Sequence, residues 1–391
     1  MQAVVPNIVH QIYDYQSPNF FLYLSLMCVQ RFMRPEQHIL FVNNEGKYRR
    51  AHWESWLKKA ESMSPTSWEH NMSKLILSNK ITIKLITFPS SPPGNDSIYV
   101  SNKAHRSDFV RMKDLESIGG IYLDTDAFAL RSFETFRYFD FTLAFDNIVN
   151  ADVTMPKRLN NGVLISAPNA SFLKVWSKEY AQFNPNSFDY DSSVVPYRLA
   201  TQHPDLVNIE MSRLSPISYS FQTSVLAEAI TCGILTRTDS IGVGVINDSF
   251  ITKSLLDSND FNAIWHPRWN PKIKGHTFDG SRPNEFMYSQ VMKKYVLHLT
   301  MSQVRGICML RKNLNDPEDL KKMPSLLGRV FRLALWGRDD YPYTALAHAS
   351  NDEKLTIWKN CRQHLGMHAT PDVDDMSRQQ YVQSRDDYYV L

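Results

Sequence analysis

Strand-length apolar segments alternate with helix-length segments over about the first 180 residues, and this alternation constrains the fold more than any other feature. It favours an α/β fold with a mainly parallel sheet covered by helices on both faces, because parallel neighbours need long crossover connections. In such folds, ligands bind at the carboxyl ends of the strands. The predicted strands cover residues 8–13, 39–43, 81–86, 121–123, 141–145 and 162–166, and the predicted helices cover 20–32, 102–117 and 170–183.

The chain has 391 residues, 43% of them hydrophobic, which allows one large or two ordinary domains. Residues 184–289 are rich in aromatic residues and proline without a regular pattern, and a helical pattern returns after residue 311. We predict a main domain of residues 1–310 and a helical C-terminal extension, 311–391, packed on it. An amphipathic stretch at 326–334 would suit a membrane surface, but packing on the core is the commoner use of such a pattern.

Composition excludes several classes of function. The net charge is +3 and no dense Lys/Arg block occurs, so no nucleic-acid partner is predicted. No apolar run approaches the roughly 20 residues that span a bilayer, and no signal peptide is recognisable, so membrane association would need a segment absent from this chain. The four cysteines form no Cys-x-x-Cys pair, which favours buried free thiols over a zinc site.

Two carboxylates, Asp124 and Asp126, follow the apolar strand that begins after Gly119-Gly120. Side chains two apart on an extended chain share a face, so both could bind one divalent cation and leave positions open for a diphosphate. The same spacing recurs at Asp189/Asp191, in a stretch that reads as a turn-rich loop, and at Asp372/Asp374, in a polar tail. Neither follows a strand, so only the first pair is predicted to be a site.

Other polar residues have both a functional and a structural interpretation. Asp108 and Arg111 lie on one face of the predicted helix that precedes the Asp124/Asp126 strand. They could form part of a ligand site or a surface ion pair. Asn161 precedes a glycine and could bind a sugar or merely form a turn. His298 follows an apolar strand and could be a metal ligand or a core histidine. His364 and His368 are four apart without a third ligand, and we interpret them as solvent-facing.

The segments 104–111, 119–126 and 160–166 together resemble the DxD sugar-binding region of retaining glycosyltransferases, among them yeast-type α-1,6-mannosyltransferases and animal α-1,4-galactosyltransferase relatives. Residues 5–13 are also similar to that family's first nucleotide-binding strand. The resemblance implies a Rossmann-type GT-A fold in the main domain, a UDP- or GDP-sugar donor, Mn²⁺ (or Mg²⁺), and a glycan or glycolipid acceptor in the Golgi lumen. The Thr-Gly-Pro segment frequent in the yeast-type enzymes is missing, so the donor base stays open.

The resemblance also implies roles for individual residues. Asp126 matches the direct metal ligand, and Asp124 matches the residue that reaches the ribose and the metal. Asp108 and Arg111 would bind the donor sugar and its phosphates, and Asn161 the sugar. His298 would complete the metal shell, although Thr300 stands where that family often has an aromatic residue.

Two other classes of function compete with a hexosyltransferase. A phosphatase of the haloacid-dehalogenase type also places Asp-x-Asp after a strand and uses the first Asp as nucleophile. That family prefers Thr or Val two residues beyond the second Asp, where this chain has Phe128. The other alternative is a protein that binds a nucleotide sugar without catalysis, because the sequence indicates a donor site and no acceptor pocket.

Overall fold

The computed structural model describes the N-terminal half of the chain almost continuously and the C-terminal half in separate stretches. The described residues are 4–14, 17–45, 49–146, 158–210, 213–214, 234–237, 241–244, 294–298, 314–323 and 326–341, with the single positions 353, 356, 357, 360 and 363. Cys232, Cys308, Cys361, His364, His368 and the pair Asp372/Asp374 lie outside them, so the predictions for these residues are not addressed by the structure.

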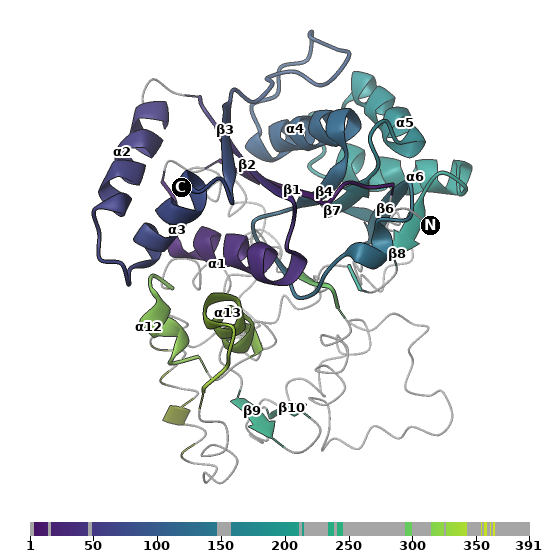
Figure 1. The fold of residues 1–391 in the computed structure, drawn as a ribbon. Coiled ribbons are helices and arrows are strands. Elements are labelled where there is room, and N and C mark those ends of the chain that lie inside the picture. The colour runs from purple at the N-terminus through teal and green to yellow at the C-terminus, as the bar shows by residue number, and fades with distance from the viewer. Residues whose placement is uncertain are drawn as a thin grey trace, which may run out of the picture.

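A seven-stranded sheet forms the centre of the fold (Figure 1), with the strand order β3-β2-β1-β4-β7-β6-β8. Only β7 runs antiparallel to its neighbours, and the other pairs in the sheet are parallel. The α/β fold and the mainly parallel sheet predicted from the sequence are therefore confirmed. The strands are β1 (Ile8–Tyr13), β2 (Gln37–Asn43), β3 (Thr82–Ile86), β4 (Gly120–Leu123), β6 (Phe141–Phe145), β7 (Leu159–Ser166) and β8 (Asn208–Glu210).

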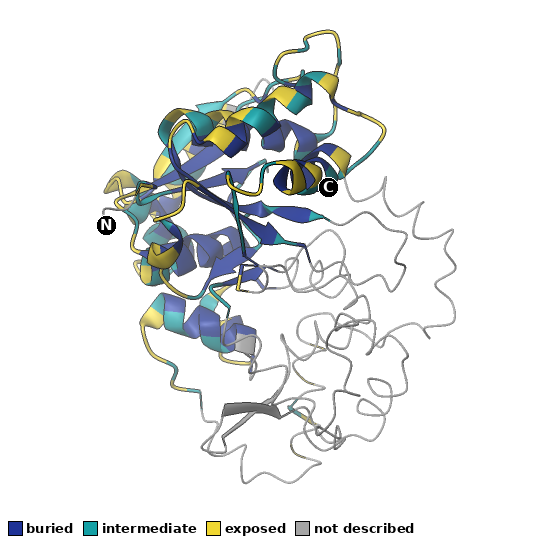
Figure 2. Ribbon diagram, turned by 90° about the vertical axis from the view of Figure 1, so that its right-hand side faces the viewer, coloured by how far each residue is buried: buried dark blue, intermediate teal, exposed yellow. Residues whose placement is uncertain are grey.

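Helices cover both faces of this sheet, because successive strand residues alternate between two hydrophobic clusters. On β2, Ile39 and Phe41 pack beneath one group of helices, and Leu40 and Val42 pack beneath the other. Figure 2 shows the buried sheet between helices that expose only their outer sides. The first group is α4 (Lys103–Ile118), α5 (Ser171–Glu179) and α6 (Val195–Gln202); the second is α1 (Phe20–Cys28), α2 (Arg49–Glu61), α3 (Trp68–Leu77), α12 (Pro317–Leu320) and α13 (Leu326–Trp336).

Several predicted elements differ from those observed. The predicted helix 20–32 is α-helical only to Cys28 and continues as a π-helical turn, Val29–Met33, before Arg34 adopts a left-handed φ of 50°. The predicted helix 170–183 consists of α5 and a 3₁₀ turn, Tyr180–Gln182. Cys28 is a buried free thiol, as predicted, and burial raises its pKa.

The apolar strand expected before His298 exists as β11 (Val296–His298), which includes the histidine, but it does not join the central sheet. It pairs antiparallel with β5 (Ala127–Ala129), which follows β4 directly. In a separate two-stranded sheet, β9 (Ile234–Arg237) pairs antiparallel with β10 (Ile241–Gly244). Because β11 is so far from β5 in sequence, this small sheet brings a distant part of the chain to the end of β4.

The amphipathic stretch at 326–334 forms α13, whose apolar side packs against α1 and Phe128. Packing on the core, the use favoured from the sequence, is therefore confirmed for this helix. Among the described residues, no helix has the length and apolar composition needed to cross a bilayer. The division of the chain at residue 310 stays a prediction.

Two glycines set the path from α4 into β4. Gly119 ends the helix with φ 66°, and Gly120 begins the strand with φ 117°, conformations that side chains rarely adopt. A Cβ on Gly120 would also collide with His10 of β1. The close passage of α4 beside β1 and β4 therefore depends on this Gly-Gly pair, and it places the polar residues of α4 next to the carboxyl end of β4.

Candidate functional site

The carboxyl ends of β1, β2, β3, β4 and β6 lie at one edge of the sheet, and β7 enters from the same edge because it runs antiparallel. Asp124 follows the last residue of β4, and Asn161 lies near the start of β7. A break in the pairing of β7 with β6 leaves residues 161–163 without partners on β6. Such a bulge redirects the backbone locally, and here it places Asn161 and Gly162 beside Asp124.

Asp124 and Asp126 belong to a tight turn and not to an extended segment. The Ala127 N–H donates to the Asp124 carbonyl at 3.0 Å and closes the turn, while the Asp124 N–H donates to the Gly162 carbonyl at 2.8 Å. The prediction that both carboxylates leave one face of a strand was therefore wrong in its geometry. They still converge, because the turn folds residue 126 back toward residue 124.

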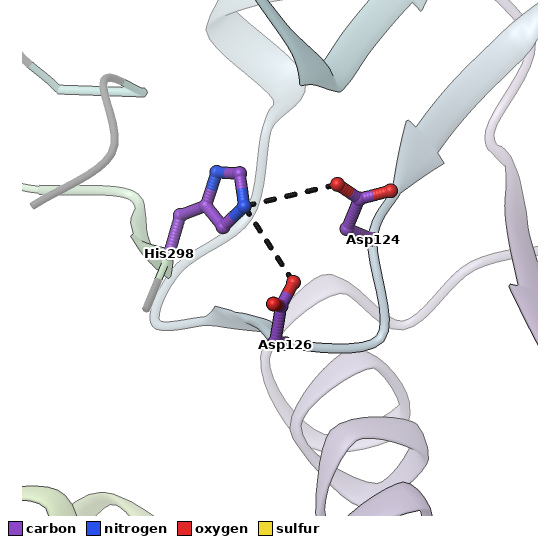
Figure 3. Close-up of side chains that lie close together, drawn as sticks. All are labelled: Asp124, Asp126 and His298. Carbon is purple, nitrogen blue, oxygen red and sulfur yellow. Dashed lines mark ion pairs between the residues drawn. The ribbon is translucent and has the colours of Figure 1, made fainter. Parts of the chain in front are cut away.

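His298 faces both carboxylates (Figure 3), with its Nε2 3.5 Å from Asp126 Oδ1 and 3.8 Å from Asp124 Oδ2. The pairing of β11 with β5 sets this position, since His298 lies opposite Ala127. One ligand atom from each of the three residues lies within 4.8 Å of the others. His298 is buried, whereas the two carboxylates are partly exposed, so the group is open to solvent on its acidic side.

The donor set fits a divalent cation. Burial disfavours the charged form of His298, but its bond to Asp126 and the nearby carboxylates outweigh this effect and raise its pKa. When His298 is protonated, the proton on Nε2 lies between the two carboxylates. A divalent cation bound at the same place would displace this proton. Gly162 lets Asp124 and His298 approach each other, because a Cβ at position 162 would lie 2.6 Å from Asp124 Oδ2 and closer still to His298 Cε1.

Asp108 and Arg111 are buried beside this group, so the surface ion pair considered from the sequence is excluded. Arg111 Nη2 lies 3.3 Å from Asp108 Oδ1 and donates to Ser107 Oγ at 2.8 Å. Arg111 Nη1 donates to the Asn161 carbonyl at 2.8 Å and lies 3.4 Å from Asp124 Oδ1. Asn161 Nδ2 in turn donates to Asp108 Oδ1 at 2.8 Å. α4, β4 and β7 are thus joined by one polar network.

Burial governs the electrostatics of this network. It raises the pKa of Asp108 to about 6, although the neighbouring Arg111 and the bond from Asn161 favour the ionised form. The positive charge of Arg111 lies between two carboxylates, Asp108 and Asp124, and so reduces their mutual repulsion. The structure therefore brings all six residues predicted from the sequence to one place, and their individual roles stay predictions.

Tyr122 was not predicted as a site residue. Its hydroxyl donates to Asp124 Oδ1 at 2.6 Å, and its ring lies under the Arg111 guanidinium at 4.2 Å. Its position two residues before Asp124, on the α4 side of β4, was the available signal. Tyr122 therefore helps to orient the first carboxylate of the turn.

Asp146 was also missed, although it follows the apolar strand β6 as Asp124 follows β4. It is buried, and burial raises its pKa to about 7 against the opposing charges of His298 and Arg158. Arg158 pairs with Asp189, a residue that we had assigned to a turn-rich loop. That description holds only in part, because Tyr190–Val194 form a π-helical turn in which Asp191 is buried.

Comparison with known proteins connects these residues to one family. Residues 46–149 match the family described as glycosyltransferase sugar-binding region containing DXD motif, which confirms the resemblance for this region. The matched range contains Asp108, Arg111, Asp124 and Asp126, and ends before Asn161 and His298.

One similar curated protein is glucan organizing enzyme 1 of Cryptococcus neoformans var. grubii, 31% identical over 123 residues. The match covers 30% of this chain and 34% of that protein, so the chain spans about a third of the relative it matches. Among solved structures, the PaToxG glycosyltransferase is 13% identical over 51% of this chain and 70% of its own, with a TM-score of 0.35. The galactosyltransferase LgtC, in complex with donor and acceptor sugar analogues, is also 13% identical over 53% and 73%, with a TM-score of 0.25.

Proposed function

We propose that this chain, which carries the sugar-binding region of the DXD-containing glycosyltransferases, is a metal-dependent retaining hexosyltransferase. The donor would be a UDP- or GDP-sugar and the acceptor a hydroxyl of a glycan or glycolipid. The observation that carries the proposal is the convergence of Asp124, Asp126 and His298 at the carboxyl edge of the sheet, inside a network that includes Arg111. Hard oxygen ligands and one imidazole suit Mn²⁺ or Mg²⁺.

Asp126 and His298 would hold the cation directly, with Asp124 beside them. A divalent cation bound there would supply charge that stabilises the leaving nucleoside diphosphate as its negative charge grows. Arg111 already lies 3.4 Å from Asp124 and could direct a guanidinium N–H toward a phosphate or sugar oxygen. Asp108 and Asn161, which bond to each other, offer an acceptor and an amide for the hydroxyls of the donor sugar.

The transfer itself would require little covalent chemistry from the protein. The bond between the anomeric carbon and the diphosphate oxygen breaks, and the acceptor hydroxyl oxygen forms the new bond on the same face of the sugar. The hydroxyl proton passes to an oxygen of the departing diphosphate, so atoms and charge balance without a protein base. The work of the side chains is to bind, to orient and to stabilise charge.

The name of the curated relative associates that protein with glucan organisation, so a polysaccharide is the first acceptor class to test. A location in the lumen of the secretory pathway, in the Golgi, would suit such an acceptor. Both points belong to the proposal, and so do the choice between UDP- and GDP-sugars and the identity of the sugar.

The test is turnover of UDP- and GDP-sugars with MnCl₂, by the full chain and by Asp126→Asn. We expect hydrolysis or transfer by the wild type and a loss of roughly a hundredfold or more in the variant, because one direct metal ligand is removed. Asp140→Asn is a matched control, since Asp140 lies at the opposite end of β6 and is exposed. Turnover that is indifferent to Asp126→Asn would refute the proposal.

Donor-binding and adduct-trapping experiments separate the two alternatives. A protein that only binds nucleotide sugars would bind the donor in an Asp126-dependent manner and transfer it to no acceptor. A haloacid-dehalogenase-type phosphatase would form a phospho- or trifluoroberyllate adduct at Asp124. We expect neither result.

A further inference from the structure

A row of mostly buried polar side chains lies in the otherwise apolar layer between β1, β2 and α1. Gln11 of β1 and Ser25 of α1 are both fully buried, and His38 of β2 is almost so. Gln30, in the π-helical turn after α1, is partly exposed and forms the outer end of this row of polar side chains. Fully buried amides are uncommon in the interior of an apolar strand unless every polar atom is paired, so the partners of Gln11 matter.

The hydrogen bonds that link these polar side chains allow only one assignment of donors and acceptors. Gln30 Nε2 donates to His38 Nδ1 at 3.0 Å, so His38 carries its proton on Nε2 and donates to Gln11 Oε1, also at 3.0 Å. Burial, with a smaller effect from the charge of His10, lowers the pKa of His38 to about 3, so the ring is neutral at ordinary pH. The amide of Gln11 is therefore held with its NH₂ group pointing away from His38.

That NH₂ group points toward the acidic turn. Gln11 Nε2 donates to Ser25 Oγ at 3.0 Å and to the carbonyl of Asp124 at 3.5 Å. The same carbonyl accepts the Ala127 N–H that closes the turn containing Asp124 and Asp126. The hydrogen bond from Gln11 thus joins β1 to the backbone of this turn.

We propose that Gln11, oriented by His38, is a positioning residue that sets the Asp124–Asp126 turn for cation binding. The side chain touches neither the cation nor a substrate, and it acts through the carbonyl of Asp124. A bond of 3.5 Å is at the outer limit for N–H···O and can shorten when the carboxylates close on a cation. This inference rests on the proposed function, because it needs a cation at Asp124, Asp126 and His298.

The experiment measures Mn²⁺ binding and not turnover. The full chain and its variants are titrated with MnCl₂, and free Mn²⁺ is followed by electron paramagnetic resonance, with Tm measured in parallel. Gln11→Met keeps the length of the side chain but removes its donor and its acceptor. We expect the affinity for Mn²⁺ to fall roughly threefold to tenfold, the range for one lost hydrogen bond.

His10→Leu is the matched control on the same strand. His10 faces α4, where its ring bonds to the Gly119 carbonyl and lies 2.6 Å from Asp114 Oδ2. Within the described part of the chain, neither of these contacts reaches the acidic turn, so replacing His10 should lower Tm and leave the affinity for Mn²⁺ unchanged. An equal loss of affinity in this control would overturn the inference, because any damage to β1 would then have the same effect.

A double variant separates positioning from stability. Gln11→Met leaves the His38 Nε2–H without its acceptor, which lowers Tm, and adding His38→Leu removes that unpaired donor. We expect Tm to recover in the double variant while the affinity for Mn²⁺ stays as low as in Gln11→Met. Recovery of the affinity together with Tm, or wild-type affinity in Gln11→Met, would overturn the inference.

Failure of the proposed function would look different. If the wild type does not bind Mn²⁺, or if Asp126→Asn binds it equally well, there is no cation site at the turn and the inference falls with it. Asp126-dependent binding that is indifferent to Gln11 would leave the proposed function intact and refute only the positioning role.

Discussion

Gly162→Ala should impair cation binding more than it impairs folding. A Cβ at this position would lie 2.6 Å from Asp124 Oδ2 and closer still to His298 Cε1, whereas carbon atoms in contact are usually about 3.5–4.0 Å apart. Both side chains must therefore move, each by about 1 Å or more. Forcing one methyl group into a packed site costs about 1–3 kcal/mol. If that cost falls on the ligand geometry, the affinity for Mn²⁺ drops by roughly fivefold to 150-fold.

The assay is titration with MnCl₂, followed by electron paramagnetic resonance, on Gly162→Ala, His298→Ala and the double variant. Because the added methyl group acts largely against His298, the two substitutions should be strongly non-additive. Ser166→Ala, at the other end of β7, is the control for altering this strand. Wild-type affinity in Gly162→Ala would refute the close approach of Gly162 to the ligands, and additive effects would refute its action through His298.

Three further predictions concern the neighbours of the acidic turn. Tyr122→Phe removes the hydroxyl that donates to Asp124 Oδ1, so Mn²⁺ affinity in the same titration should fall by roughly threefold to tenfold, and no change would exclude an orienting role. Arg111→Lys loses the planar fork whose two nitrogens bond to Ser107 and Asn161. UDP or GDP should therefore stabilise the variant less than the wild type in a thermal-shift assay, and an equal shift would contradict a phosphate-binding role. Asp146 has a pKa of about 7 in the folded protein, compared with 3.8 for an ordinary carboxyl. Between these two values unfolding releases its proton, so the free energy of unfolding should decline as the pH rises from about 4 to about 7. Asp146→Asn should reduce this decline in denaturant titrations, and an unchanged slope would refute the raised pKa.

The order of elements could be predicted from local pattern alone. The continuous apolar run of residues 39–42 and the Gly119-Gly120 pair after a helix are local signals, and both elements formed where expected. The polar residues of α4 were also predictable as a pair, because three residues of helix place Asp108 and Arg111 on one face. Whether that face is buried is not a local property, since it depends on which strands pack beneath it.

Predictions that depended on neighbouring strands failed or were missed. Asp124 and Asp126 were predicted to lie two positions apart on one extended segment, but a hydrogen bond from the Asp124 N–H to Gly162 and one from the Ala127 N–H to Asp124 fold them into a turn. No local pattern marks Tyr122 or Asp146 as site residues. Tyr122 belongs to the site through Arg111 and Asp124, and Asp146 through the charge of His298. Gln11 carries no local signal of a role either, because its partners come from α1, β2 and the acidic turn.

The chemistry at the centre of the site follows from residue type and short spacing, because two carboxylates at the end of an apolar strand are chelating groups in any fold that keeps them together. The third donor, His298, has no sequence neighbour that indicates its purpose. It reaches the carboxylates only because β11 pairs with β5, which lies about 170 residues earlier in the sequence. Cation ligation requires atoms within a few ångströms of one another, and tertiary pairing alone determines that distance for residues so far apart.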